Sequence, residues 1–335
     1  MKKLRTLALA TLLLYGPAHA EDIPIKFTLD WKIQGVHGWF YLAKEKGYFA
    51  DEGLDVTIDQ GAGSAATVTR IMSGAYDAGF GDMNAIIQNA ATNPDEAPVM
   101  VYQIYNQPPF AVLTKTGGPV TDLKSLEGRN VGAPPGSAST KLFPALAEAA
   151  GFDVSSVEIT SVAPNLQEQM LIQGQVDASL VFNVTSYLNI IGLGMDPDTE
   201  FTWFPYGEAG LDIYSNGVMV SPKLIADHPE AVTGLVSAIA KAMADVIADP
   251  LEGVAIIKKI EPLSNEELEL KRLQFALNNL IYSDESRVNG IGAVDPARLG
   301  RSIEIIKGLY DLPTTPEVSA VFSDAYLPPL EMRSY

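Results

Sequence analysis

The stretch that decides the fold is TLDWKIQGVHGWFYLAKEKGYFADEGLDVTI, residues 28–58. Apolar residues alternate with polar ones before this stretch and at its end, a spacing that predicts two strands. Between them lie a polar, aromatic turn, residues 30–38, and a helical pattern, residues 39–46, which Gly47 is suited to end. We therefore expect strand, turn, helix and strand, with the turn at the carboxyl end of the first strand.

Strands and helices continue to alternate along the first half of the chain, which favours open parallel α/β sheets. Two short motifs occur twice. Residues 63–67 (GSAAT) are similar to residues 136–140 (GSAST), and residues 71–78 (IMSGAYDA) are similar to residues 171–178 (LIQGQVDA). Because both pairs occupy the same places in the order of elements, we expect two related lobes.

Two extended segments, residues 110–114 and 215–220, are predicted to carry the chain between these lobes. The expected division is lobe I at residues 21–109 plus 218–335 and lobe II at residues 110–217. The predicted fold class is thus α/β, with mainly parallel sheets in two lobes joined by two crossing segments.

The first twenty residues have the pattern of a secretory signal. Lys2, Lys3 and Arg5 form a basic start, residues 7–14 are apolar, and residues 18–20 (Ala-His-Ala) form a small-x-small cleavage site. The apolar run is far shorter than the roughly 20 residues of a membrane span. We expect cleavage after Ala20, no lipid anchor because no cysteine is near, and a location in a bacterial periplasm.

The charge and composition exclude several classes of function. The formal net charge of the whole chain is −18, and removal of the three basic residues of the signal leaves about −21. Nucleic acids and anionic lipid surfaces require basic footprints, so neither is an expected partner. The chain has no cysteine, and only His37 and His228 follow the signal. With no nucleotide, metal or hydrolase motif either, we expect no cofactor and no enzyme activity.

Ligands of open α/β sheets bind at the carboxyl ends of the strands, so the candidate site lies in the loops there. We predict no metal site and no catalytic residues. The predicted ligand-binding residues are Trp31, Gln34, His37, Gly63, Ser64, Ala65, Asp82, Met83, Tyr102, Tyr105, Ser137, Ala138, Phe182, Asn183, Glu208 and Tyr214.

The two G-S-A motifs are the predicted polar anchors, one in each lobe. Ser64 and Ser137 each stand at a helix start, where free N–H groups and the helix dipole favour an acceptor or a negative group. The alternative is that both serines are ordinary helix caps.

Aromatic and acidic residues indicate what kind of ligand these loops would hold. Trp31 is placed to stack on a flat ligand. Core packing and ligand contact are equally compatible with Tyr102, whereas a lone histidine such as His37 is more often structural than a ligand contact. Asp82 and Glu208, unless they are solvated or cap helices, would favour N–H donors. No arginine lies in the candidate loops, which argues against a small anion held by guanidinium groups.

Residues 29–31 (Leu-Asp-Trp), 37–38 (His-Gly), 41–49 and 52–56 resemble the opening of the periplasmic solute-binding proteins of ABC importers. The branch is the one for nitrate, sulfonate, taurine and the thiamine-pyrimidine precursors formylaminopyrimidine and hydroxymethylpyrimidine. The G-S-A loop and residues 74–82 extend the resemblance. It implies a type II periplasmic-binding fold, a monomer that closes on a small-molecule ligand by hinge bending, and delivery to an ABC permease with its cytoplasmic ATPase.

Leu-Asp-Trp after the first strand resembles the pyrimidine-precursor branch, in which the tryptophan and nearby polar residues contact the pyrimidine; this implies such a role for Trp31 and His37. Residues 32–34 (Lys-Ile-Gln) depart from the Pro-Asn-containing loop of that branch. The leading hypothesis is therefore a receptor for a pyrimidine-like heteroaromatic solute. A receptor for a small anion, held at Ser64 and Ser137, and a secreted enzyme remain alternatives. The family also includes a eukaryotic pyrimidine synthase with pyridoxal phosphate and a cysteine-rich iron motif, which this cysteine-free chain is not expected to be.

Overall fold

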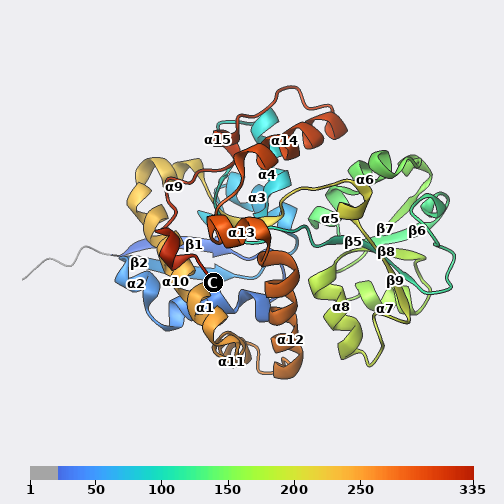
Figure 1. The fold of residues 1–335 in the computed structure, drawn as a ribbon, viewed down its shortest axis with the longest axis horizontal. Coiled ribbons are helices and arrows are strands. Elements are labelled where there is room, and N and C mark those ends of the chain that lie inside the picture. Colours follow the sequence, from blue (N-terminus) through green and yellow to red (C-terminus); the bar gives the residue numbers. More distant parts are fainter. Residues whose placement is uncertain (1–21) are drawn as a thin grey trace, which may run out of the picture.

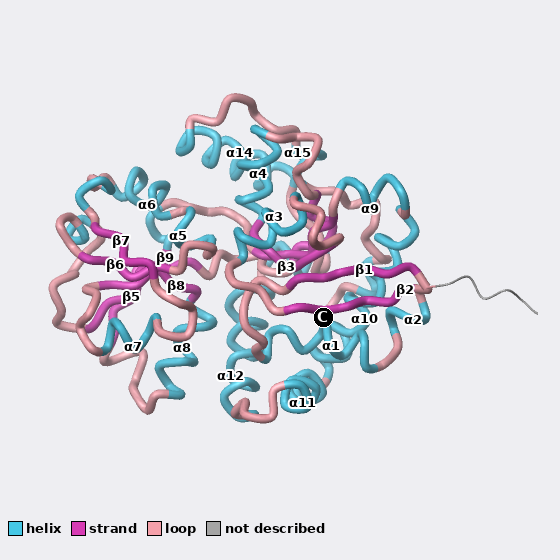
Figure 2. The backbone as a smooth tube through the Cα atoms, turned by 180° about the vertical axis from the view of Figure 1, so that it is seen from behind, coloured by secondary structure: helices cyan, strands magenta, loops and turns pink. Residues whose placement is uncertain are grey.

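The structure is a computed structural model that describes residues 22–335, so the predicted signal, residues 1–20, lies outside the described part. These residues form two α/β lobes that lie side by side (Figure 1). One lobe contains both the first and the last parts of the described chain, and the other contains the middle part. Figure 2 shows the strands gathered at the centre of each lobe with helices around them.

The two sheets have the same plan. The first has the strand order β2 (Leu54–Asp59), β1 (Ile23–Thr28), β3 (Ala78–Asp82), β10 (Asn216–Val220) and β4 (Val99–Gln103). The second has the order β7 (Glu158–Ser161), β6 (Asn130–Ala133), β8 (Ala178–Phe182), β5 (Phe110–Lys115) and β9 (Phe201–Pro205). In each sheet the first three strands are parallel, and the fourth strand is antiparallel to both of its neighbours.

The strands that follow the crossings are the antiparallel ones. Residues 110–114 and 215–220, predicted as crossing segments, form β5 and β10. The chain therefore passes between the lobes just before them, through residues 104–109 and 206–215. The first predicted lobe boundary falls at the start of β5. The second, between residues 217 and 218, falls inside β10, which pairs with the strands of the first sheet from Asn216 onward.

Helices cover both sheets and extend the first lobe. Those of the first lobe are α1 (Gly38–Glu45), α2 (Tyr48–Asp51), α3 (Ser64–Met72), α4 (Met83–Thr92), α9 (Pro222–Asp227), α10 (Pro229–Ala248), α11 (Pro250–Ile260), α12 (Glu266–Ala276), α13 (Asp284–Asn289), α14 (Pro296–Tyr310) and α15 (Val318–Val321). Those of the second lobe are α5 (Ala138–Lys141), α6 (Phe143–Ala150), α7 (Gln167–Ile172) and α8 (Asn183–Gly192).

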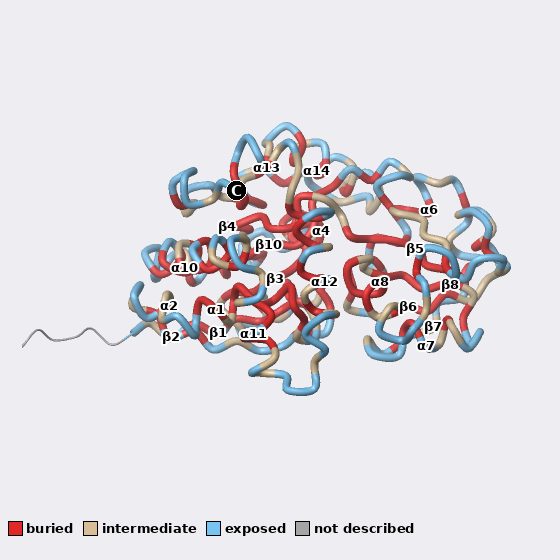
Figure 3. The backbone as a smooth tube through the Cα atoms, turned by 60° about the horizontal axis from the view of Figure 1, so that its bottom comes forward, coloured by how far each residue is buried: buried red, intermediate tan, exposed pale blue. Residues whose placement is uncertain are grey.

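The predicted unit at residues 28–58 forms one side of the first sheet, with β2 at its edge, together with the helix α1 that packs on it. The helix α1 ends as expected, because Gly47 adopts a left-handed conformation with φ of 76°. The rings of Phe27 and Phe40 lie 5.0 Å apart and those of Phe40 and Phe80 lie 5.3 Å apart, so α1 packs directly on β1 and β3. Burying such side chains stabilises a fold by about 2–3 kcal/mol each. Figure 3 shows that the buried segments form the interiors of the lobes and the exposed ones their rims.

Among residues 22–335, α10 alone is long and apolar enough to cross a membrane by length and composition. Of its most apolar window, 61% is buried inside the protein. Its side chains, Val232, Leu235 and Ile239 among them, belong to the hydrophobic core of the first lobe.

Candidate ligand-binding site

The two lobes enclose a cavity at the carboxyl ends of β1 and β8. The volume open to the centre of a water molecule is about 20 Å³, and all the empty space between the lining atoms, including the open mouth, is about 450 Å³. Among residues 22–335, aromatic rings, hydroxyl groups and amides line it, together with one carboxyl group and no lysine or arginine. The lining residues are Asp30, Trp31, Gln34, Val36, His37, Ser64 and Tyr105 from the first lobe, and Ser137, Gln167, Leu180, Phe182, Val184, Thr185 and Ser186 from the second.

The carboxyl group of Asp30 is the main polar anchor of the first-lobe wall. Asp30 stands two residues after the last residue of β1 and is 6% exposed. Its Oδ1 accepts a hydrogen bond from His37 Nε2 at 2.8 Å, and its Oδ2 accepts one from Asn216 Nδ2 at 2.7 Å. Each carboxyl oxygen has a second lone pair, so Asp30 can accept a further hydrogen bond from an N–H group in the cavity.

His37 orients this carboxyl group. Its Nδ1 accepts the backbone N–H of Gln34 at 3.0 Å, so the ring hydrogen must lie on Nε2 and is donated to Asp30. The histidine is fully buried in the short turn Gly35–His37. Because both ring nitrogens are used, His37 supports the site and has no free nitrogen for proton transfer.

Aromatic rings reach the cavity from both lobes. On the first-lobe side, Trp31 and Tyr105 line it, and Phe80 packs edge-on against the Tyr105 ring at 5.3 Å. Burial raises the pKa of the Tyr105 hydroxyl well above its ordinary value, and nearby Asp30 raises this pKa further. The phenol therefore remains a hydrogen-bond donor. Phe182 lines the opposite wall and packs edge-on against Phe110 at 5.3 Å.

The second-lobe wall comes from β8, α7 and the first turn of α8. Gln167 Nε2 donates to the carbonyl of Leu180, and Ser186 Oγ donates to Glu168 Oε1 at 2.6 Å. Thr185 Oγ1 donates across the cavity to Gln34 Oε1 at 3.3 Å. A direct contact between the two walls shows that the lobes are closed.

The two G-S-A motifs meet across the interface between the lobes. The backbone N–H of Ala66 donates to the Gly136 carbonyl at 3.2 Å, and the N–H of Ala138 donates to Ser64 Oγ at 3.2 Å. At Gly63, whose φ is 147°, a Cβ atom would lie 2.0 Å from the Gly136 carbonyl oxygen. Two of the helix-start N–H groups predicted to favour an anion are thus used between the lobes.

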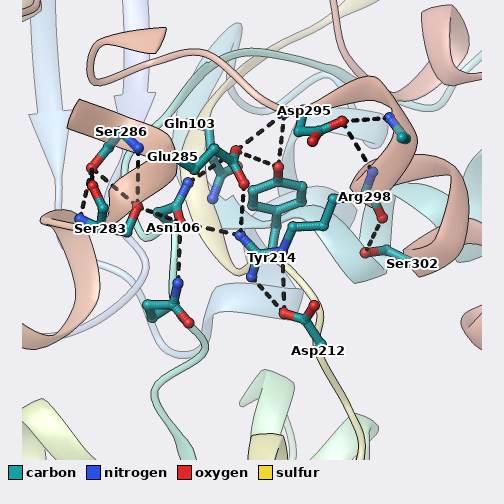
Figure 4. Close-up of polar contacts among 12 residues, drawn as sticks. Gln103, Asn106, Asp212, Tyr214, Ser283, Glu285, Ser286, Asp295, Arg298 and Ser302 are labelled. Carbon is teal, nitrogen blue, oxygen red and sulfur yellow. Dashed lines mark hydrogen bonds and ion pairs between the residues drawn. The ribbon is translucent and has the colours of Figure 1, made fainter. Parts of the chain in front are cut away.

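A second polar cluster, the crossing network, lies where the chain passes between the lobes (Figure 4). It consists of Asn106, Asp212, Tyr214, Glu285 and Arg298. Arg298 donates to Asp212 at 2.9 Å, to Asn106 at 3.1 Å and to Glu285 at 3.2 Å, and its guanidinium lies 4.2 Å from the centre of the Tyr214 ring. Both crossing segments are thereby attached to α13 and α14.

Seven of the predicted site residues line the cavity: Trp31, Gln34, His37, Ser64, Tyr105, Ser137 and Phe182. Gly63, Ala65 and Ala138 lie in or next to the contact between the G-S-A loops. Contact of any of these residues with a ligand stays a prediction.

The remaining predicted residues lie away from the cavity lining. Asp82 accepts the N–H of Ala85 and caps α4, which Met83 begins. Tyr102 is buried in the core of the first lobe and Tyr214 belongs to the crossing network. The last two are Asn183, whose Oδ1 accepts the N–H of Val184, and Glu208, which is exposed.

The prediction omitted half of the cavity lining. Asp30, Gln167, Thr185 and Ser186 are its missed polar residues, and Val36, Leu180 and Val184 its missed apolar ones. Asp30 offered the clearest signal, because it lies just after the end of β1 and immediately before Trp31. Within residues 22–335, no group of three or more His, Cys, Asp or Glu side chains could hold a metal ion.

The model of the family described as "NMT1/THI5 like" matches residues 34–253, which is more than half of the chain. The chain belongs to this family. Among curated relatives, the riboflavin-binding protein RibY of Chloroflexus aurantiacus is 23% identical over 296 residues, covering 86% of this chain and 82% of RibY. The formylaminopyrimidine-binding protein of Halalkalibacterium halodurans is 23% identical and covers 76% and 77% of the two chains. A 4-amino-5-hydroxymethyl-2-methylpyrimidine phosphate synthase of Saccharomyces cerevisiae is 25% identical and covers 80% and 82%.

Solved structures show the same fold. The alkanesulfonate-binding protein SsuA of Xanthomonas axonopodis bound to MOPS has a TM-score of 0.67 at 14% identity, covering 91% of this chain and 99% of SsuA. The periplasmic nitrate-binding protein NrtA of Synechocystis has a TM-score of 0.66 at 15% identity, covering 91% and 87%. The predicted resemblance and the two-lobed periplasmic-binding fold are thus confirmed for this NMT1/THI5-like protein.

Proposed function

We propose that this protein is the periplasmic substrate-binding receptor of an ABC importer and that it captures a pyrimidine-like heteroaromatic solute. The observation that carries the proposal is the chemistry of the cavity lining. It combines the carboxyl group of Asp30 with the rings of Trp31, Tyr105 and Phe182, and among the described residues it includes no lysine or arginine. A flat ring with N–H donors satisfies both features, by stacking on an aromatic ring and donating to the carboxyl group.

The relatives support this class of ligand. Two bacterial relatives are named for the solutes that they bind, riboflavin and formylaminopyrimidine. Both solutes contain a pyrimidine ring. A small anion would meet the carboxyl group of Asp30 without a counter-charge in the lining. The helix-start N–H groups of Ala66 and Ala138 are also occupied in the closed protein.

A binding role also fits the described residues better than catalysis does. Both ring nitrogens of His37 are engaged, and His228 is exposed beside Glu230. No serine of the cavity therefore has a free histidine base, and the chain has no cysteine nucleophile. The yeast relatives are named as synthases, so turnover of a bound pyrimidine is the direct test of this part.

We further propose that the mature protein is a periplasmic monomer, that its signal is cleaved after Ala20, and that the closed lobes present one combined surface to a permease. Signal pattern, fold and relatives support this proposal. Mass determination of the secreted protein, together with light scattering, tests the cleavage site and the monomer.

Ligand identity is tested by mass spectrometry of gently purified protein and by calorimetric titration. Probes are 4-amino-5-hydroxymethyl-2-methylpyrimidine, formylaminopyrimidine and riboflavin, against ethanesulfonate, taurine, nitrate and benzoate. Asp30→Asn should weaken pyrimidine binding about ten- to a hundredfold, because a charge-assisted hydrogen bond contributes about 1.5–3 kcal/mol. Glu208→Gln, the same kind of change at an exposed carboxyl group, should leave affinity unchanged. Binding of sulfonates alone, strengthened by Asp30→Asn, would instead establish the anion receptor.

A further inference from the structure

The helix α12 carries a buried ion pair that touches both walls of the cavity. Glu269 and Arg272 are three residues apart and therefore lie on one face of the helix. Arg272 Nε donates to Glu269 Oε2 at 3.0 Å, and the two residues are 2% and 8% exposed. Lys271 and Glu267 form a second ion pair on the same helix, but this pair faces solvent.

Glu269 holds the first-lobe wall. Its Oε2 accepts the backbone N–H of Gly35 at 2.6 Å. Gly35 lies between Gln34 and Val36, which both line the cavity. A Cβ atom at Gly35 would lie 2.4 Å from the carbonyl oxygen of Glu269, so this turn rests directly on the backbone of α12.

Arg272 holds the second-lobe wall. Its Nη1 donates to the carbonyls of Val184 at 2.9 Å and Thr185 at 2.8 Å, and its Nη2 donates to Asn189 Oδ1 at 3.0 Å. Val184 and Thr185 line the cavity from the first turn of α8. Because α12 belongs to the first lobe and α8 to the second, these three bonds must break when the lobes separate (Figure 1).

We infer that Glu269 and Arg272 are positioning residues that couple closure of the lobes to the placement of both cavity walls. The inference rests on the proposed function, because it takes the cavity as the ligand site. Arg272 stabilises the closed state through charge-assisted hydrogen bonds to the lobe that moves away. Glu269 compensates its charge and holds the turn at Gly35. The Glu269–Arg272 pair therefore sets the dissociation rate of a bound ligand, although neither side chain contacts that ligand.

The test measures closure directly. The chain has no cysteine, so Leu193→Cys and Leu263→Cys introduce two unique labelling sites. These residues lie next to α8 and α12 and are 45% and 100% exposed. Spin labels on the two cysteines give the distribution of distances between the labels, measured in the presence of 4-amino-5-hydroxymethyl-2-methylpyrimidine. The rate at which a short bismaleimide joins the two cysteines reports the closed population without any ligand.

Arg272→Gln should lower the closed population and raise the dissociation rate of the pyrimidine about tenfold or more, whereas its association rate changes little. Arg272→Lys should restore part of the loss, because an ammonium group lacks the planar fork of the guanidinium. Lys271→Gln is the matched control, which removes the exposed pair of the same helix. Its distances and rates should equal those of the unsubstituted protein.

Glu269→Gln is the second variant, in case Arg272→Gln folds poorly. It keeps an acceptor for Gly35, removes the counter-charge of Arg272, and should lower the closed population in the same direction. Equal cross-linking rates in Arg272→Gln, Glu269→Gln and Lys271→Gln would overturn the inference, and so would a lowered unfolding temperature with unchanged closure. If the pyrimidine binds to no variant, the proposed ligand is wrong, whereas the cross-linking rates without ligand still decide the role of the pair.

Discussion

Two Arg–Glu pairs of the first lobe, each with a buried arginine, differ in what they hold. The partners of the Arg272–Glu269 pair lie on α8, in the other lobe, and on the turn at Gly35: Arg272 donates to the carbonyls of α8, and Glu269 accepts the N–H of Gly35. The partners of Arg298 lie on α13 and on the two crossing segments. Arg272 is therefore attached to the part that must move away on opening. Arg298 is attached to the axis about which such a motion would take place.

The difference shows that the same chemistry can have two roles in one fold. A buried pair whose acceptors stay in place contributes to the free energy of unfolding. A pair whose acceptors lie on another rigid body contributes to the free energy of closure, because its contacts exist in one state only. Measurements of unfolding and of closure therefore separate the two pairs.

The largest effect on unfolding is expected from Arg298→Met. The change leaves the half-buried Glu285 without its cation and removes the contacts with Asp212 and Asn106. Breaking a fully buried pair costs about 3–5 kcal/mol; because Glu285 is half-buried and Asp212 is exposed, we expect a loss of about 2–3 kcal/mol in the free energy of unfolding. Urea titration measures the loss.

Arg287→Met is the control for this prediction, because Arg287 pairs with Asp284 on the surface of α13. The comparison between the two pairs fails if Arg298→Met costs no more than this control. It also fails if Arg298→Met changes the cross-linking rate of the lobes as strongly as Arg272→Gln does.

The next effect concerns pH, through an acid beside the crossing network. Asn84 Nδ2 donates both to Asp82 Oδ1 at 3.0 Å and to the Tyr214 carbonyl at 2.7 Å. Burial raises the pKa of Asp82 from 3.8 to about 7, although hydrogen bonds from Asn84 and Ala85 act in the opposite direction. Unlike Glu285, Asp82 has no ion-pair partner among the described residues.

The sign of the pH effect follows from this pKa. Between about 4 and 7 the folded protein binds more protons at Asp82 than the unfolded chain, so the free energy of unfolding falls as pH rises through this range. Above pH 7 the full cost of the buried charge remains. Asp82→Asn should therefore increase stability at pH 8 by about 1–3 kcal/mol and have little effect at pH 4. Urea titrations across this range test it, and parallel curves for the two proteins would contradict the assigned cause.

Asp82 and Asp30 also show what sequence can predict about a site. Both stand where a first-lobe strand ends, a local pattern that does not distinguish the residue that lines the cavity from the one that does not. Whether a side chain reaches the cavity depends on partners far along the chain. Asn216, which holds Asp30, is 186 residues away, whereas the partners of Asp82 lie on the helix that it caps and turn it away from the cavity.

The fold was more predictable than the site, because its signals are local. The alternation at residues 28–58 and the repeated motifs were sufficient to predict two related α/β lobes. The direction of β10 depends on its pairing with β3, more than 130 residues away in the sequence, and could not be predicted from spacing. Neither could the contacts of Arg272, because the carbonyls that it binds lie 87 and 88 residues earlier in the chain.

The smallest effect is expected from Ser64→Ala, which removes one hydrogen bond of closure and none of the ion pairs. Ser64 Oγ accepts the N–H of Ala138 across the interface, and no hydrogen bond joins its side chain to its own lobe among the described residues. Its loss should weaken pyrimidine binding about two- to fivefold, equivalent to about 0.5–1 kcal/mol, and leave unfolding unchanged. An anion held at the G-S-A loops would lose a direct ligand contact instead. A loss of more than tenfold for ethanesulfonate, with none for the pyrimidine, would therefore transfer the role of main anchor from Asp30 to Ser64.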